Sequence, residues 1–285
     1  MKLLFVHGRS QGGKDPVKLQ SEWLSALTAG LEKANLSLPP SVQIDFPFYG
    51  DRLDQLAQAF DLPADPAVLP KGSPAFDEFA AFKADVAAEM QRKAGISDEQ
   101  VQAECRTDST EKGVQNWAWV QAVIRLLDRQ LTGISQTTIE VFLRDVFLYT
   151  HRDVVRNAIN QIVSQKMSAD TAVVIGHSLG SIVAYNLLRA ASKRVPLFVT
   201  VGSPLAIRAV RNTLGPITNP AGSGWYNAYD KRDIVALYPL DQNNFSVDPA
   251  ITNNGNVDNR TDNRHGIIGY LDDVVVAKTI YSGLR

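Results

Sequence analysis

The sequence predicts an α/β fold in which a mostly parallel sheet is flanked by helices, with a large helical insertion. In two stretches of the chain, short apolar segments of strand character alternate with amphipathic segments of helical spacing. This alternation is typical of parallel strands joined by helical crossovers. Between residues 51 and 150 the alternation stops and the pattern is helical throughout. We therefore predict a core made of residues 1–50 and 151–285, and a helical cap or lid over residues 51–150.

The core begins with an apolar run over residues 2–6, which predicts a buried strand. Asp15 and Pro16 then fit the N-cap and first position of a helix. Residues 41–48 alternate between apolar and polar side chains, which predicts a second strand.

The insertion contains several helical signals, with Pro and Gly breaks around residues 63–74. Ser97 and Gln100 have the spacing of a capping box. Aromatic residues are frequent, and such residues are more often part of a cap's own core than substrate contacts. The aromatic side chains in question are Phe76, Phe79, Phe82, Trp117 and Trp119. The three phenylalanines continue with Val86 and Met90 as one apolar stripe.

The C-terminal part of the core predicts a helix over 151–167, strands over 171–175, 196–201 and 225–229, and a closing helix over 272–284. Residues 241–264 are rich in Asn and are expected to be mostly loop with at most one strand. Right-handed crossovers place the loops after parallel strands along one edge of the sheet. We therefore expect a functional site at that edge.

The strongest motif is Gly176-His177-Ser178-Leu179-Gly180, a G-x-S-x-G pattern between an apolar strand and an apolar helix. The serine of such a motif stands on a sharp turn, and small residues two positions before and after it make room for that turn. The motif alone is weak among 19 glycines, but its strand-and-helix context makes Ser178 a candidate nucleophile.

A serine hydroxyl needs a base to take its proton. Of the four histidines, His265 alone follows the acid candidates in a loop before the last helix, as the chain order Ser, acid, His requires. The acid is expected after the strand near residue 229, where Asp230 and Asp233 both qualify. We favour Asp233, because the loop beyond the strand end lets its side chain reach the imidazole.

An oxyanion would need two backbone N–H donors. Topology predicts one from Leu179, the residue after the nucleophile, and one from Arg9 or Ser10 in the loop after the first strand.

Composition excludes several function classes. The chain has 29 Lys and Arg against 30 Asp and Glu, a net charge of −1, so it lacks the excess of positive charge that would favour binding to nucleic acid or an anionic membrane. This balance fits a neutral substrate. Cys105 is the single cysteine, which precludes an internal disulfide and favours a reducing compartment. The apolar run at the N-terminus is shorter than a signal segment and no stretch has transmembrane length, so we expect a cytoplasmic protein.

Three other interpretations are weaker. The stretch from Gly8 to Lys14 fits a phosphate-binding loop, but Asp15 stands where that motif needs Ser or Thr. A metal site is not expected, because no pair of histidines has helical ligand spacing. A catalytically inactive binding module would usually lack one of the three site residues, and here all are present in order.

These residues resemble the α/β-hydrolase superfamily, in particular small bacterial lipases and the serine esterases related to GPI inositol-deacylases. The resemblance covers about residues 1–50 and 151–285, and its most specific part is Val173 to Gly180. It implies an α/β-hydrolase fold with an oxyanion donor at Arg9 after His7-Gly8. It also implies that the second acid, Asp233, is the catalytic one. The insertion and the Asn-rich stretch depart from the family pattern.

The resemblance implies a cofactor-independent serine hydrolase that forms an acyl-enzyme on a small-molecule or lipid ester. The residues do not separate esterase or lipase from thioesterase or peptidase. A helical cap often forms one wall of an acyl pocket. We therefore expect an apolar acyl group under the insertion, and longer acyl esters to be cleaved better than acetate.

Overall fold

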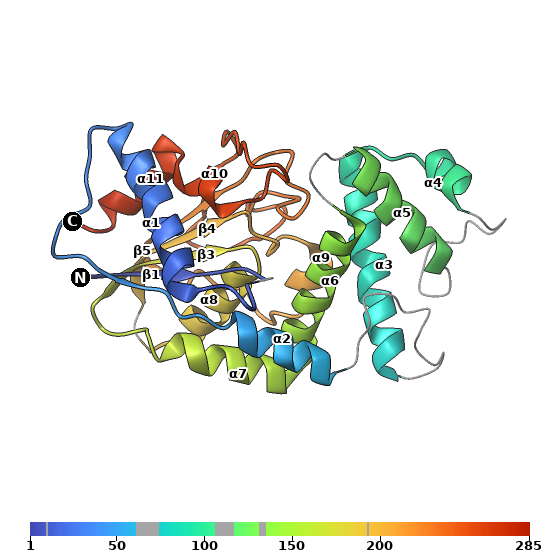
Figure 1. The fold of residues 1–285 in the computed structure, drawn as a ribbon, viewed down its shortest axis with the longest axis horizontal. Coiled ribbons are helices and arrows are strands. Elements are labelled where there is room, and N and C mark those ends of the chain that lie inside the picture. The colour runs from blue at the N-terminus through green and yellow to red at the C-terminus, as the bar shows by residue number, and fades with distance from the viewer. Residues whose placement is uncertain (10, 61–73, 106–116, 131–134, 193) are drawn as a thin grey trace.

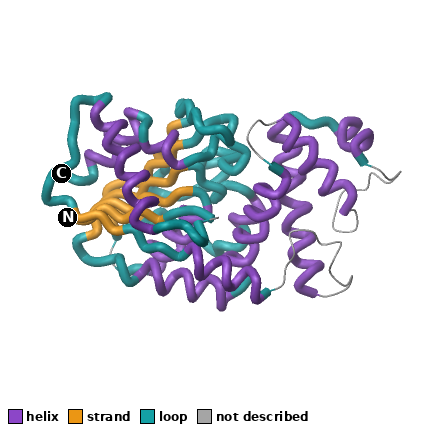
Figure 2. Tube along the Cα trace, viewed as in Figure 1, coloured by secondary structure: helices purple, strands orange, loops and turns teal. Residues whose placement is uncertain are grey.

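The computed structural model describes residues 1–9, 11–60, 74–105, 117–130, 135–192 and 194–285; the side chains of residues 74–77 and 117 lie outside the described part. The described chain has an α/β fold in which a parallel sheet of six strands is flanked by helices, as the sequence predicts (Figures 1 and 2).

The order of the strands across the sheet defines where a site can form. From edge to edge they are β2 (Gln43–Asp45), β1 (Lys2–Val6), β3 (Thr171–His177), β4 (Val195–Val201), β5 (Ala221–Ala228) and β6 (Thr252–Asn254), all parallel to their neighbours. From β1 the sheet grows to β2 on one side and to β3 on the other. Such a reversal leaves a crevice at the carboxyl ends of the two central strands. Here Val6 of β1 lies opposite Gly176 of β3 in the register.

Helices cover both faces of the sheet. One face carries α1 (Pro16–Glu32), α10 (Ile267–Leu271) and α11 (Val274–Ser282), and the other carries α2 (Gly50–Ala59), α7 (Asp153–Ser164) and α8 (Leu179–Ala190) (Figure 1). Side chains of β1 alternate between the two layers: Leu3 and Phe5 pack with the first set, Leu4 and Val6 with the second. A single-turn helix, α9 (Arg208–Arg211), follows β4.

Most of the predicted insertion forms a group of helices at one end of the molecule (Figure 1), whereas its first helix, α2, covers the sheet. The helices of the group are α3 (Pro74–Ala94), α4 (Asp98–Glu104), α5 (Trp117–Gln130) and α6 (Gln136–His151). The capping box of Ser97 and Gln100 is present at the start of α4. Across the described ranges, no helix is both long enough and apolar enough to cross a membrane.

The apolar stripe of α3 is buried within this group. Phe79, Phe82, Val86 and Met90 are each at most 5% exposed, whereas the side chain of Phe76 lies outside the described residues. The hydrophobic cluster to which they belong continues without a break to Leu4 and Val6 of the sheet. The inserted helices therefore share one apolar core with a face of the sheet.

Several expected elements differ in extent from those of the structure, two of them with a clear physical cause. The strand over 41–48 is reduced to β2, because it pairs only with β1 at the sheet edge and Pro47 has no N–H to donate. The helix over 151–167 is also shorter. His151 ends α6, Arg152 is extended at φ −122° and ψ 106°, and α7 begins at Asp153. The extended residue lets its guanidinium reach Glu78 of α3 at 2.9 Å.

The short helix α10 was not expected from the sequence, and the closing helix α11 starts later than residue 272. Asp273 caps α11, because its carboxylate accepts hydrogen bonds from Val275 N and Val276 N. The Asn-rich stretch contains one short strand, β6, within the expected range.

Gly180 is expected to be essential for joining α8 to β1. A Cβ at this position would overlap the carbonyl oxygens of Val6 and His7. At a solvent-exposed position inside a helix, replacing Gly by Ala raises the free energy of unfolding by about 1 kcal/mol. At Gly180, overpacking reverses the sign, and we expect Gly180→Ala to lower the free energy of unfolding by about 1–3 kcal/mol. Urea unfolding measures the change.

The matched control is Gly224→Ala, since a Cβ there meets no atom within 4 Å. Equal stability of the two variants would contradict the close packing at Gly180.

Candidate active site

Ser178 lies between β3 and α8 in a conformation that side chains rarely adopt. Its φ of +55° and ψ of −130° fall in the left-handed half of the backbone map. The turn is tight, because a Cβ on Gly176 would lie 2.6 Å from Ser181 Cα. Such strain is characteristic of functional turns. The residue is 2% exposed, and its strand–turn–helix setting is the one that the G-x-S-x-G motif requires.

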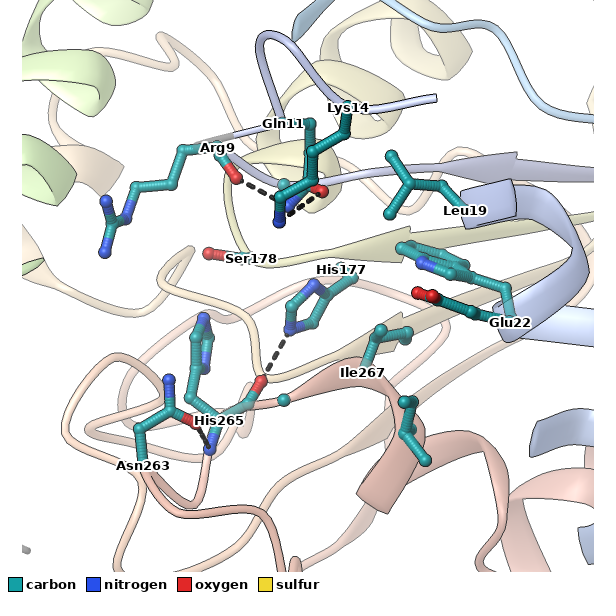
Figure 3. A pocket seen from close by; sticks show the side chains of 14 residues that line it. Arg9, Gln11, Lys14, Leu19, Glu22, His177, Ser178, Asn263, His265 and Ile267 are labelled. Carbon is teal, nitrogen blue, oxygen red and sulfur yellow. Dashed lines mark hydrogen bonds between the residues drawn. The ribbon is translucent and has the colours of Figure 1, made fainter. Parts of the chain in front are cut away.

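The loop after β1 contacts this turn directly. A Cβ on Gly8 would lie 2.9 Å from Ser178 Cβ, so the main chain at Gly8 packs directly against the side chain of Ser178. Arg9 follows Gly8, and its carbonyl accepts a hydrogen bond from Gln11 Nε2 at 2.8 Å. Ser178, His265 and Arg9 line one cavity of about 300 Å³ (Figure 3).

His7 holds the start of this loop. Its Nδ1–H donates to the Gly8 carbonyl at 2.6 Å, and its Nε2 accepts from Tyr49 N–H at 3.0 Å. The Tyr49 ring stacks on the imidazole with centroids 3.9 Å apart. These two hydrogen bonds define the neutral tautomer, and burial lowers the pKa of His7 to about 4.

The bond from His7 also orients the following peptide. Because the C=O and N–H of a trans peptide point in opposite directions, a fixed Gly8 carbonyl turns the Arg9 N–H away from His7. Leu179 is the first residue of α8, and its N–H has no carbonyl one turn earlier within the helix. Ser10, the alternative donor, lies outside the described residues.

His265 and Asp233 form a hydrogen-bonded pair. His265 Nδ1–H donates to Asp233 Oδ2 at 2.7 Å, and the carboxylate is fully buried. The other oxygen, Asp233 Oδ1, accepts from Val235 N at 2.8 Å and Ala236 N at 3.3 Å. The carboxylate is therefore fixed from both sides.

Asp230, the other acid candidate, has different partners. Its Oδ1 accepts from Arg232 N and Nε, and its Oδ2 accepts from Arg232 Nη2 and Asn259 N. Burial alone would raise the pKa of Asp230, but these hydrogen bonds outweigh it and the net pKa is lowered. Asp230 thus joins the loop after β5 to the loop that carries His265.

Tyr270 is a site residue to which sequence analysis assigned no role. Its hydroxyl donates to Asp233 Oδ2 at 2.6 Å and accepts from Asp230 N at 3.2 Å. Burial and the charge of Asp233 raise its pKa well above the usual value of 10. The available signal was its position five residues after His265, in a helix that follows directly.

His177 supports the backbone of His265. Its Nε2–H donates to the His265 carbonyl at 2.8 Å (Figure 3). Burial is the main cause that lowers the pKa of His177 to about 3, and repulsion from His265 acts in the same direction. His177 is therefore a neutral hydrogen-bond donor at physiological pH.

The Asn-rich stretch shapes the loop of His265. Asn263 Oδ1 accepts from His265 N at 3.1 Å, and Asn259 Nδ2 donates to Gly266 O at 2.9 Å. Arg264, directly before His265, has a φ of +55°. Side-chain amides thus replace regular secondary structure in this segment.

Ser178 Oγ accepts and donates no hydrogen bond among the residues that the structure describes, although it is buried. It shares its cavity with His265, and Asp233 lies behind His265. The structure therefore brings Ser178, His265, Asp233, the loop of Arg9 and the start of α8 at Leu179 together at the carboxyl edge of the sheet.

A second, smaller cavity of about 30 Å³ lies between the inserted helices and His265. Its apolar wall comes from Met90, Ile139 and Phe142 of the inserted helices and from Ile234 and Val235, which follow Asp233 in the loop after β5. Arg9, Asn263 and His265 line both cavities.

Most of the aromatic residues singled out in the insertion are core residues. Phe79, Phe82 and Trp119 are buried within the helical group and line neither cavity. The side chains of Phe76 and Trp117 lie outside the described residues.

Among the described side chains, no three His, Cys, Asp or Glu residues lie close enough to hold a metal ion together. Comparison of the chain with protein-family models, with curated proteins and with solved structures gave no match. The geometry itself is therefore the basis for a functional interpretation.

Because His7 and His177 are buried in the neutral form, we expect the free energy of unfolding to decrease at acidic pH. Their pKa values lie near 4 for His7 and near 3 for His177, against 6.5 when unfolded. Below pH 6.5 the unfolded chain therefore binds more protons, and stability falls as the pH falls toward 4. We expect each histidine to contribute a slope of about 1.4 kcal/mol per pH unit in that window. Urea unfolding at several pH values measures it.

His177→Gln keeps a donor for the His265 carbonyl but cannot titrate. Its stability should fall less steeply between pH 6 and 4, and parallel the wild type above pH 7. Identical slopes below pH 6 would show that His177 is not held neutral.

Proposed function

We propose that this chain is a serine hydrolase of the α/β-hydrolase type that cleaves carboxylic esters through an acyl-enzyme. One observation carries the proposal. A buried serine in a left-handed strand-to-helix turn shares a cavity with a histidine whose other nitrogen is bound to a buried carboxylate. That arrangement has the chemical parts of a Ser-His-Asp triad.

The proposed reaction uses the lone pair of His265 Nε2. Because Nδ1–H is donated to Asp233, Nε2 is free of its proton in the neutral imidazole and accepts the proton of Ser178. Ser178 Oγ attacks the ester carbonyl, and the Arg9 and Leu179 N–H groups bind the oxyanion. The imidazolium then protonates the leaving alcohol as the C–O bond breaks. Water repeats these steps on the acyl-enzyme and releases the acid.

The missing hydrogen bond of Ser178 is compatible with this role, since catalytic hydrogen bonds are often long without substrate. The position of the residues also supports it. They follow β1, β3, β5 and β6 at the edge of the sheet where parallel sheets of this topology bind ligands. We further propose that the inserted helices act as a cap over this edge, with the small apolar cavity as its inner wall.

The same parts could serve a thioesterase or a peptidase, or remain in an inactive binding module. No observation favours these over an esterase. Nucleotide binding is disfavoured, because the Asp15 carboxylate accepts the Val17 and Lys18 N–H groups at the start of α1 and occupies the place of a phosphate.

The nucleophile can be tested by labelling with a fluorophosphonate, which reacts with activated serines. We expect stoichiometric labelling of the wild type and none of Ser178→Ala, read by intact mass. Ser181→Ala is the matched control, because the Ser181 hydroxyl donates to Ser178 O nearby. A folded wild type that is not labelled, or labelling that survives Ser178→Ala, would contradict the proposal.

Tyr270 should tune the proposed base through Asp233. Tyr270→Phe removes a donor from the carboxylate, which then attracts the imidazolium more strongly. We expect kcat/KM for p-nitrophenyl esters to fall roughly tenfold and its acidic limb to move to higher pH.

Tyr281→Phe in α11 is the control. Tyr281 packs against the apolar cluster that α1, α10 and α11 form on one face of the sheet, and it lines neither cavity of the candidate site. A Tyr270→Phe variant with lower activity but an unshifted acidic limb would indicate a purely structural role.

A further inference from the structure

Arg9 brings a positive charge to the candidate site. Its side chain lines both the cavity of Ser178 and the smaller cavity under the inserted helices. Its guanidinium lies 6.0 Å from the centre of the Phe142 ring. In Figure 3 it extends along the side of the cavity to which Ser178 Oγ points. A charged side chain on the wall of the cavity that holds the candidate nucleophile can orient a polar group of a ligand.

The surroundings of Arg9 retain this charge. Burial lowers the pKa of Arg9 to about 10, the charge of Asp145 raises it and that of Arg144 lowers it. The guanidinium is therefore protonated at neutral pH. Asp145 is fully buried in α6, and its Oδ1 already accepts from Arg144 Nε at 3.0 Å and Nη2 at 2.9 Å. The charge of Asp145 thus acts on the guanidinium groups of both Arg144 and Arg9, and its hydrogen bonds to a guanidinium come from Arg144.

The other charged side chains of the larger cavity, Lys14 and Glu22, lie on other parts of its wall (Figure 3). Lys14 is exposed and donates to Gln11 Oε1 at 3.2 Å. Glu22 lies beside Leu19 at the opposite end from Arg9 (Figure 3). The cation of Arg9 is therefore the charge on the side of the cavity to which Ser178 Oγ points (Figure 3), and its burial reduces solvent screening.

We propose that the ester cleaved at Ser178 carries a second, ionised carboxylate close to the scissile bond, and that the Arg9 guanidinium binds this carboxylate. The proposal rests on the hydrolase function given above. A guanidinium is suited to this role because its planar N–H groups match a carboxylate in two parallel hydrogen bonds. The two functions of Arg9 would be separate: its backbone N–H faces the oxyanion and its side chain faces the substrate carboxylate.

The first experiment compares pairs of esters that differ only in charge. For an acyl-side carboxylate, the pair is p-nitrophenyl hydrogen adipate and its methyl ester. For an alcohol-side carboxylate, the pair is 4-acetoxybenzoate and its methyl ester. Rates with Ser178→Ala are subtracted as background. We expect kcat/KM of the wild type to favour the anionic member of one pair by about tenfold or more.

The second experiment repeats the favoured pair with variants. Arg9→Met should reduce the ratio of the two kcat/KM values to about one, and Arg9→Lys should retain part of it, since it keeps the charge without the planar fork. Lys14→Met removes a cation from the outer part of the same cavity and should leave the ratio unchanged. The ratio cancels any general loss of activity or of folded protein.

The outcomes separate this inference from the hydrolase function. If the wild type cleaves the neutral and anionic members of both pairs equally, or if Lys14→Met rather than Arg9→Met removes the preference, the role of Arg9 is wrong while the hydrolase stands. If Ser178 is not labelled and no ester is cleaved, both the hydrolase function and the role of Arg9 are wrong.

Discussion

The contact between the end of β1 and the turn at Ser178 is the constraint on which the site depends. Gly180 meets the carbonyls of Val6 and His7, and Gly8 meets the side chain of Ser178. Both contacts are possible only without a Cβ, so they fix the two loops at backbone distance. The cavity, the direction of the Arg9 N–H and the start of α8 follow from this packing. The relative position of the two loops is therefore set by main-chain packing at Gly8 and Gly180.

Histidines serve two different purposes around this contact. His7 and His177 are buried and neutral, and both bind main-chain groups. His7 uses both ring nitrogens and holds the loop after β1, and His177 donates from Nε2 to the loop of His265. His265 keeps one nitrogen for chemistry in the proposed mechanism. The structure thus separates histidines that hold loops from the one that would move a proton, and burial is what distinguishes them.

The sequence predicted the parts of the fold that depend on local patterns. The strands β1 and β3, the Asp15 cap and the Ser97 capping box all follow from a few neighbouring residues. It failed where tertiary packing decides, as in the short β2 and the break at Arg152.

The same limit applies to the candidate site. Asp230 and Asp233 look alike in sequence, and only the structure gives one of them His265 as a partner and the other Arg232. Their catalytic roles stay a prediction. The bonds of Tyr270 to Asp233 and of His7 to Tyr49 join distant segments and leave no local pattern. The charge balance of the whole chain likewise says nothing of a single guanidinium at a cavity wall.

The unbroken apolar cluster between the sheet and the inserted helices has a consequence for the evolution of the chain. Its members run from Leu4 of β1 through Phe147 of α6 to Trp119 of α5. Deleting α3 to α6 would expose the apolar surface that α2 and α7 now present to these helices, so the group cannot be lost without exposing part of the core. Core and insertion are then expected to unfold in one cooperative transition. Sequence change at this interface must be compensated on both sides, whereas exposed positions such as Gln102 and Ala103 on the outer helix α4 are free to vary.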